Sequence, residues 1–178
     1  MTEQTQQSGA ETLERVATAL ADLPYEKVDC RDGMPSIEVE RASLKEALTR
    51  LRDAGAFEQA TFVTAIDHYP DEPRYELNHQ LLSFAHNDRL RVKCRLQADD
   101  AQAPTCIDLW PGAAYMEREC FDMFGIVFEG HEGLKRLLMP EGYDHHPLKK
   151  DFPHQGIEPD RLYREWDAKR RQGWSPEE

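Results

Sequence analysis

The segment from Arg89 to Leu96 alternates strictly between cationic and apolar residues. An arginine or a lysine occupies every second position, and a leucine, a valine or a cysteine follows each of them. Successive side chains of a β-strand point to opposite faces of the sheet. The pattern therefore predicts a strand with one face in a hydrophobic core and four positive charges on the other. That charged face suits either of two roles, pairing with carboxylates on neighbouring strands or contacting a partner molecule.

Two more segments with strand-like composition precede this strand. They run from Thr61 to Asp67 and from Arg74 to Phe84. Turn-forming residues at positions 70–73 and 87–88 separate the segments. We therefore expect three consecutive strands in this part of the chain.

Two helices and a short strand are expected before these three strands. The apolar spacing from Leu13 to Leu20 predicts an amphipathic helix that stops before Pro24. The alternation from Ile37 to Val39 predicts a short strand. The residues from Ser43 to Glu46 have the pattern of a capping box that opens a second helix, and Gly55 is expected to close it. The predicted order is helix, strand, helix and three strands.

The chain changes character beyond residue 128. Before that point, Pro111 and Gly112 introduce a predicted helix that Gly125 ends. Residues 129–158 are dense in glycine, proline and histidine and have little periodicity, so we expect an irregular, extended segment there. A helical pattern then returns, with five basic and two acidic residues between positions 161 and 172.

The charge balance excludes several classes of protein. The 178 residues include 34 Asp and Glu against 22 Lys and Arg, which gives a net charge of −12. This balance argues against non-specific binding to nucleic acid or to anionic lipid, which requires clustered basic residues. No apolar run approaches the ~20 residues needed to span a bilayer, and the first residues lack the pattern of a signal peptide. The four cysteines show no CxxC spacing, and we interpret them as reduced thiols.

Most catalytic motifs are absent from the sequence. It contains no GxGxxG, no GxxxxGK[ST] and no GxSxG, so dinucleotide, P-loop and nucleophile-elbow sites have no support. A weak metal-site candidate remains at Asp144 and His145, with His131 earlier in the chain. Adjacent histidines such as His145 and His146 point in opposite directions on an extended chain, so at most one of them faces a given metal. We prefer the interpretation that these histidines bind loop backbone.

The densest charge group lies on the helix predicted before Gly125. Arg118 and Asp122 are four residues apart, and Glu119 and Asp122 are three apart, so we expect a ladder of salt bridges along the helix. Glu117 and Glu119 lie on different sides of such a helix. Arg118 would keep Asp122 ionised and unsuited to donating a proton. The group therefore favours a contact surface over acid–base catalysis.

Two long blocks of the sequence resemble one known family. The run from Glu117 to Ile126, continued to Leu138, is similar to the signature of the 30-kDa, or C, subunit family of proton-pumping NADH:quinone oxidoreductase, respiratory complex I. The block from His146 to Pro153 resembles the second signature of that family, and the strand region from Asp67 to Lys93 also matches. The resemblance covers roughly residues 11–155. It departs from the family pattern at three positions in the loops: Glu132, Tyr143 and His145.

The resemblance implies a fold and an organisation. The fold is α+β, a mostly antiparallel sheet with helices packed on one side and an extended, loop-rich C-terminal segment. The chain is then divided into a flexible N-terminus (1–10), an α+β domain (11–128), an extended partner-docking segment (129–158) and a C-terminal basic helix or tail (159–178).

The resemblance also implies a role without chemistry on this chain. The chain would be a non-catalytic component of the peripheral arm, on the cytoplasmic side of the inner membrane, attached to the membrane only through the complex. It would pack against the D and B subunits and bind no nucleic acid. It would hold no cofactor and no metal, because FMN and the iron–sulfur clusters belong to other subunits. Electron transfer, quinone reduction and proton translocation would be activities of the whole complex.

The family signature marks the residues expected at the partner interface. We expect residues 147–153 to be buried in the partner, with two apolar anchors and three charged contacts among them. The expected interface and signature residues are Glu117, Arg118, Glu119, Asp122, Gly125, His131, Arg136, Pro147, Leu148, Lys149, Lys150, Asp151 and Phe152. Of these, Leu148 and Phe152 are the apolar anchors.

Two other functions remain open at this point. The first is the equivalent subunit of a related membrane-bound hydrogenase, or of a complex that oxidises ferredoxin or a deazaflavin. The second is a stand-alone metal-dependent hydrolase that uses Asp144, His145 and His131. The identity of co-purifying subunits would separate the first from complex I, and bound metal would support the second.

Overall fold

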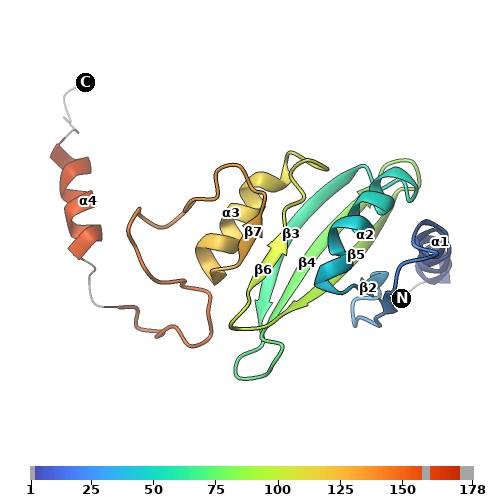
Figure 1. The fold of residues 1–178 in the computed structure, drawn as a ribbon, viewed down its shortest axis with the longest axis horizontal. Coiled ribbons are helices and arrows are strands. Elements are labelled where there is room, and N and C mark those ends of the chain that lie inside the picture. Colours follow the sequence, from blue (N-terminus) through green and yellow to red (C-terminus); the bar gives the residue numbers. More distant parts are fainter. Residues whose placement is uncertain (1–2, 158–160, 173–178) are drawn as a thin grey trace.

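The fold is built on a five-stranded sheet with the strand order β1-β2-β5-β4-β3. The computed structural model describes residues 3–157 and 161–172. The long strands form an antiparallel meander, β2 joins β5 in parallel, and β1 pairs with β2 antiparallel (Figure 1). The strands are β1 (Glu26–Lys27), β2 (Ser36–Glu38), β3 (Gln59–Asp67), β4 (Tyr75–Ser83) and β5 (Asp88–Leu96). This mostly antiparallel α+β arrangement confirms the predicted fold class.

The alternation in β5 determines which face of the sheet is buried. Its four apolar side chains are at most 2% exposed and lie in the core. Across the ladder to β4, Leu90 is opposite Leu81 and Cys94 is opposite Leu77, so both strands place apolar residues on the same face. The predicted inward and outward assignment is therefore confirmed.

The cationic face of β5 is paired within the chain. Glu76 on β4 lies 3.1 Å from the Lys93 ammonium and 2.8 Å from the Arg95 guanidinium. Arg91 contacts the Asp32 carboxylate at 2.6 Å. Of the two roles predicted for this row of charges, pairing with neighbouring carboxylates holds for three of the four residues.

Three helices lie on the apolar side of the sheet: α1 (Glu3–Ala19), α2 (Arg41–Asp53) and α3 (Ala113–Phe124). The buried face of α2 contributes leucines to the core, including Leu48, which is fully buried. In α3, the Cys120 thiol donates to the Val63 carbonyl oxygen of β3 at 3.5 Å. α1 begins at Glu3 and thus takes in residues 3–10, which we expected to belong to a flexible terminus.

The predicted capping box is wrong. α2 begins at Arg41 after Glu40, which makes no side-chain cap, and Ser43 already lies in the first turn, where its N–H donates to the Glu40 carbonyl oxygen. The reason is tertiary: the Val39 N–H pairs with the Lys93 carbonyl oxygen of β5, so the chain enters the helix as soon as this pairing ends.

The end of α2 follows the prediction, but for a different reason. The helix ends at Asp53, and the left-handed residue after it is Ala56, with φ 53°, and not Gly55. A Cβ atom on Gly55 would lie 2.7 Å from the Leu51 carbonyl oxygen. Glycine is therefore needed there for close packing.

Three short strands were not predicted from the sequence: β1, β6 (Gln102–Pro104) and β7 (Val127–Glu129). The last two form a small parallel sheet beside α3 (Figure 1). Residues 130–157 contain no helix or strand, and we call them the C-terminal segment. α4 (Arg161–Gln172) follows and stands away from the rest of the molecule (Figure 1). Within the described ranges, no helix combines the length and apolar character needed to cross a bilayer.

Candidate functional site

The C-terminal segment is attached to α3 through the carboxylate of Asp122, which is fully buried. One carboxylate oxygen accepts a bond from Arg136 at 2.7 Å. The other accepts the backbone N–H groups of Leu137, Leu138 and Met139 at 3.0, 2.7 and 2.8 Å. Burial alone would raise the pKa of Asp122, but the backbone donors and Arg136 outweigh it and lower the pKa. We call Asp122 with Arg136 the first anchor.

The predicted salt-bridge ladder on α3 is wrong. Arg118 donates to the Lys135 and Arg136 carbonyl oxygens, at 3.1 and 2.8 Å, instead of pairing with Asp122. Glu119 is exposed. The physical reason is that a buried carboxylate requires several donors, and the folded-back segment supplies four to Asp122.

Glu117 makes its contacts on the side of α3 opposite to Asp122. Its buried carboxylate accepts the Thr105 hydroxyl at 2.5 Å and the Cys106 N–H at 2.7 Å. These bonds tie the end of β6 to the helix. Burial, together with the charge of Glu117, raises the pKa of the Cys106 thiol, which keeps it protonated. Glu117 is therefore a structural residue of the domain and does not face the surface.

A second anchor joins the turn between β3 and β4 to the far end of the segment. The guanidinium of Arg74 donates to both Asp67 oxygens, at 2.9 and 2.8 Å, and to both Asp151 oxygens, at 3.1 and 2.8 Å. It lies 5.0 Å from the ring centre of Tyr69 and 5.2 Å from that of Tyr75. We call Asp67, Arg74 and Asp151 the second anchor.

The inner carboxylate of the second anchor is saturated with donors. Besides Arg74, Asp67 accepts the backbone N–H groups of Lys150 at 2.8 Å and Tyr69 at 3.0 Å. Burial alone would raise the pKa of Asp67, but these hydrogen bonds hold it at about 2. The Asp67 carboxylate is therefore ionised at every physiological pH.

His146 connects the segment to the end of α3 between the two anchors. Its Nδ1 lies 2.9 Å from the Asp122 carbonyl oxygen. Two residues further along, the Leu148 N–H donates to the Met123 carbonyl oxygen. Gly125 ends the helix with φ 78°, and a Cβ atom there would lie 2.8 Å from the His146 ring. Burial lowers the pKa of His146. Glycine is thus required both by the backbone conformation and by the close approach of His146.

The residues of the candidate metal site are not brought together. His131 lies with Nε2 3.1 Å from the Ala114 carbonyl oxygen, as expected for a histidine that binds backbone. Asp144 and His145 are exposed. Among the residues that the structure describes, no group of three or more His, Cys, Asp or Glu side chains is placed to hold a metal ion.

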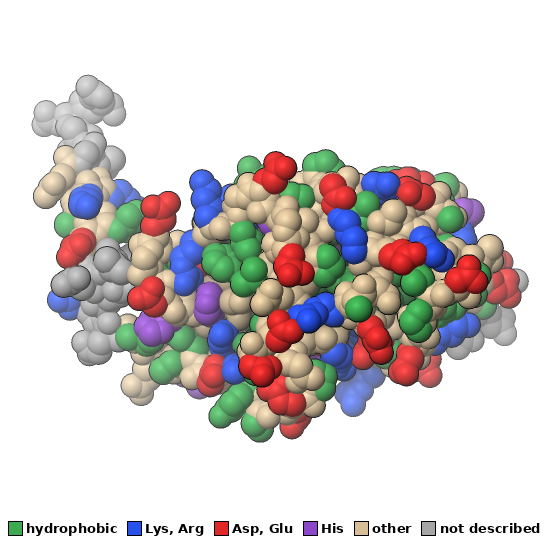
Figure 2. Space-filling model, in the orientation of Figure 1, with side chains coloured by type: hydrophobic (Ala, Val, Ile, Leu, Met, Phe, Trp, Pro, Cys, Tyr) green, Lys and Arg blue, Asp and Glu red, His purple; other side chains and the backbone are tan. Residues whose placement is uncertain are grey.

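The outer surface of the C-terminal segment exposes apolar side chains. Leu138 is 63% exposed, Leu148 is 52% exposed and Ile157 is 41% exposed. Phe152, the other predicted apolar anchor, is half-buried beside the His145 ring. Apolar, histidine and basic side chains lie side by side at this end of the molecule (Figure 2). A shallow hollow of about 580 Å³ runs along residues 147–156.

Fold and site together define a small α+β domain whose buried charged residues anchor an irregular C-terminal segment. Residues 37–158 match the family described as "Respiratory-chain NADH dehydrogenase, 30 Kd subunit". Since this match covers well over half of the 178 residues, the chain belongs to that family.

Curated relatives carry matching names. The chain is 39% identical to the C subunit of NADH-quinone oxidoreductase from Citrifermentans bemidjiense, with 83% of this chain and 88% of that protein covered. It is 43% identical to the C/D 2 subunit of NADH-quinone oxidoreductase from Aquifex aeolicus, with 82% of this chain covered. The chain spans only 24% of that C/D protein, and 51% of the C subunit from Saccharopolyspora erythraea.

Two solved structures share the fold. A trypsin-resistant fragment (1-134) of Nqo5 is 32% identical, with a TM-score of 0.59 over 69% of this chain and 99% of that chain. A chain of an archaeal respiratory membrane complex, the membrane-bound sulfane sulfur reductase, has a TM-score of 0.67 over 96% of this chain and 95% of that chain, at 23% identity. At this identity the second likeness shows the fold alone.

Sequence reasoning found one anchor and missed the other. The signature drew attention to Asp122, Gly125 and Arg136, whereas helical spacing gave Asp122 the wrong partner, Arg118. Asp67 and Arg74 lie in the strand region that matched the family, but no role was predicted for them. The signal was an acidic residue and an arginine on either side of a proline-rich turn, which places both at the same end of two paired strands.

Proposed function

We propose that this chain is the C subunit of a proton-translocating NADH:quinone oxidoreductase and that it acts without catalytic residues of its own. In this proposal it supports the quinone-reducing module by packing against a D-like and a B-like subunit. It lies in the peripheral arm on the cytoplasmic side of the cell membrane, and FMN and the iron–sulfur clusters are bound by other subunits.

The anchored C-terminal segment is the observation that carries the proposal. Two buried carboxylates, Asp122 and Asp67, bind backbone N–H groups of the segment and hold it in one conformation. Two of its leucines, Leu138 and Leu148, are nevertheless exposed to solvent. A segment that is pre-organised in this way loses little entropy when a partner covers it, and exposed apolar side chains gain from being covered. This combination suits a docking surface.

Family membership supports the identity of the partner. Two relatives are named as C/D proteins, the one from Aquifex aeolicus and one from Sulfurihydrogenibium, in which a C part and a D part form one chain. Parts joined in one polypeptide are held close together. We therefore propose a D-like subunit as the direct partner of this chain, with a B-like subunit beside it.

Affinity purification of the tagged chain from mildly solubilised native membranes tests the proposal. Mass spectrometry should find a D-like and a cluster-bearing B-like subunit, and the eluate should reduce quinone with NADH. A nickel–iron or ferredoxin-dependent module in place of the NADH module would identify a related complex instead. Recovery of the chain alone would contradict the proposal.

A deletion tests the role of the segment directly. Removal of residues 140–153 should abolish co-purification of the D-like subunit, because it removes both the second-anchor contact and the exposed Leu148. The same deletion leaves the sheet and its apolar core in place. Normal assembly of the deleted chain would show that another surface carries the interaction.

A further inference from the structure

The part of the C-terminal segment from residue 147 to 156, which we call the basic loop, carries a charge imbalance created by the fold. Asp151 is its only carboxylate. Both oxygens of Asp151 are bound by the Arg74 guanidinium, on the inner side of the loop. Arg74 is buried, so Asp151 is held against the body of the molecule. Arg74 lies outside the loop, and its single guanidinium is shared between Asp151 and Asp67.

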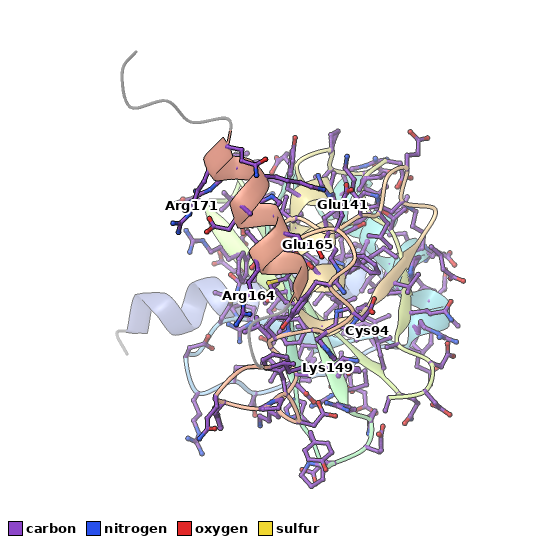
Figure 3. All side chains as sticks on the ribbon, turned by 90° about the vertical axis from the view of Figure 1, so that its left-hand side faces the viewer. Cys94, Glu141, Lys149, Arg164, Glu165 and Arg171 are labelled. Carbon is purple, nitrogen blue, oxygen red and sulfur yellow. The ribbon has the colours of Figure 1, made fainter. Side chains whose placement is uncertain are left out.

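The two lysines of the loop form no ion pair within the described residues, although the charge of Lys149 contributes to the lowered pKa of Asp151. Within residues 3–157 and 161–172, no carboxylate lies within ion-pair distance of the Lys149 or the Lys150 ammonium group. Lys150 is exposed and Lys149 is half-buried. Figure 3 faces this end of the molecule and shows Lys149 on the loop, separate from the charged residues of α4. In a chain with a net charge of −12, two adjacent unpaired lysines stand out.

The backbone of the basic loop is fixed in successive turns. The Lys149 N–H donates to the His146 carbonyl oxygen, and the Phe152 N–H donates to the Lys149 carbonyl oxygen. The Lys150 N–H is bound to Asp67. These bonds shape the shallow hollow, whose lining includes both lysines and the half-exposed Leu148. The loop therefore presents two cations and one apolar side chain from a rigid frame.

We propose that the basic loop binds an acidic segment of the partner protein, with carboxylates opposite Lys149 and Lys150 and an apolar residue against Leu148. This inference rests on the proposed function, since it assumes that the loop is covered by a neighbouring chain of the complex. Covering an ammonium group without a counter-ion is costly. No carboxylate of the described residues forms an ion pair with either lysine, so we expect the partner to supply one. Complementary charges also fix the orientation of the two chains.

Zero-length cross-linking of the intact complex tests the proposal. A carbodiimide joins a lysine amine to a carboxylate only when the two are in contact. Treatment of the purified complex should yield amide links from Lys149 or Lys150 to aspartate or glutamate residues of the partner. Recovery of the complex with neither lysine linked, and with both lysines acetylated as fast as in the free chain, would overturn the inference.

Charge reversal gives a second, quantitative test. The double variant K149E/K150E should lower the amount of co-purified partner by about tenfold or more, since loss of close interfacial charge pairs typically costs at least this much affinity. The matched control is K27E/R31E, which makes the same change in net charge at exposed residues of the β1–β2 region, at the other end of the molecule. This control should change recovery by less than about twofold.

The outcomes separate this inference from the proposed function. If K149E/K150E and the control co-purify the partner equally well, the acidic-segment inference fails while the subunit role stands. If the unmodified chain brings down no partner at all, the proposed function itself fails. Restored recovery when a cross-linked carboxylate of the partner is changed to lysine in the K149E/K150E background would identify the contact.

Discussion

The sheet with its helices and the C-terminal segment are held in place by different forces. In residues 3–129, which we call the body, apolar side chains from β3, β4, β5, α2 and α3 form one buried cluster. In the C-terminal segment, most side chains are exposed or half-buried, and two ionic anchors attach it to the body. Apolar burial is non-directional and gives the body its stability. Hydrogen-bonded carboxylates are directional, and they hold the segment in position without covering its surface.

The largest expected effect is in the core of the body. Leu77→Ala should lower the free energy of unfolding by about 2–5 kcal/mol, because Leu77 is fully buried and its removal leaves a cavity. Urea denaturation of the purified chain measures this. The control is Leu138→Ala in the segment, which removes a side chain that is 63% exposed and should cost less than about 0.5 kcal/mol. Equal losses in the two variants would refute the division into two regions.

The second prediction concerns pH. His79 lies in the core opposite Val63 and Val92, and neither ring nitrogen has a hydrogen-bond partner among the described residues. Burial lowers the pKa of His79 from 6.5 to about 4. As pH falls below 6.5, His79 becomes protonated in the unfolded chain but stays largely neutral in the folded chain. The body therefore loses about 3 kcal/mol of stability by pH 4.

The carboxylate of the second anchor contributes the same stability throughout this pH range. The pKa of Asp67 is about 2 in the folded chain, below its ordinary value of 3.8. Its stabilising effect is therefore complete above pH 3.8 and is lost only as pH falls towards 2. Unfolding curves of wild type and His79→Leu at several pH values test both of these pH dependences. The variant should lack the loss between pH 6.5 and 4, whereas Leu77→Ala should be weakened at every pH. A wild-type loss that persists in His79→Leu would remove His79 as its cause.

The third prediction concerns a variant that weakens the first anchor. Asp122→Asn keeps the shape of the side chain but loses its charge, and the amide directs N–H donors at groups that are themselves donors. The expected cost is about 1–3 kcal/mol. Hydrogen exchange should accelerate at the amides of Leu137, Leu138 and Met139 more than in β4. The exposed Glu119→Gln, on the same helix, is the control and should leave exchange unchanged. Uniform acceleration throughout the chain would mean that Asp122 stabilises the body and not the segment.

The smallest effect is expected at the second anchor. Arg74→Lys keeps the positive charge but removes the planar fork that binds Asp67 and Asp151 together. Because Asp151 is 45% exposed, the loss should be on the order of 1 kcal/mol. Trypsin should then cleave after Lys149 and Lys150 faster than in wild type. Arg89→Lys, at an exposed position of β5, should not change the cleavage rate. Protection equal to wild type would show that Asp67 alone holds the loop.

Much of the body could be predicted from local patterns. The alternation of Arg89–Leu96 determined a strand, its buried face and its charged face, because a strand has a side-chain period of two. Apolar spacing and Gly125 likewise located α3 and its end. Short strands such as β6 and β7 escaped detection because their three residues do not alternate between apolar and polar side chains, unlike Ile37 to Val39. The start of α2 was misplaced because pairing between Val39 and Lys93 outweighed the local capping pattern.

The two anchors of the candidate site show what local sequence patterns cannot predict. From its sequence neighbours, Asp122 was expected to pair with Arg118, four residues away on the same helix. The tertiary structure gave it Arg136 and three backbone N–H groups, and it joined Arg74 to Asp151, 77 residues apart in the chain. Spacing rules describe only groups on one element, whereas a buried carboxylate binds whichever donors the fold brings around it. The sequence by itself thus determined the three long strands, the faces of β5 and the family. Only the tertiary structure decided the strand order, which charged groups are paired within the chain and which remain for a partner.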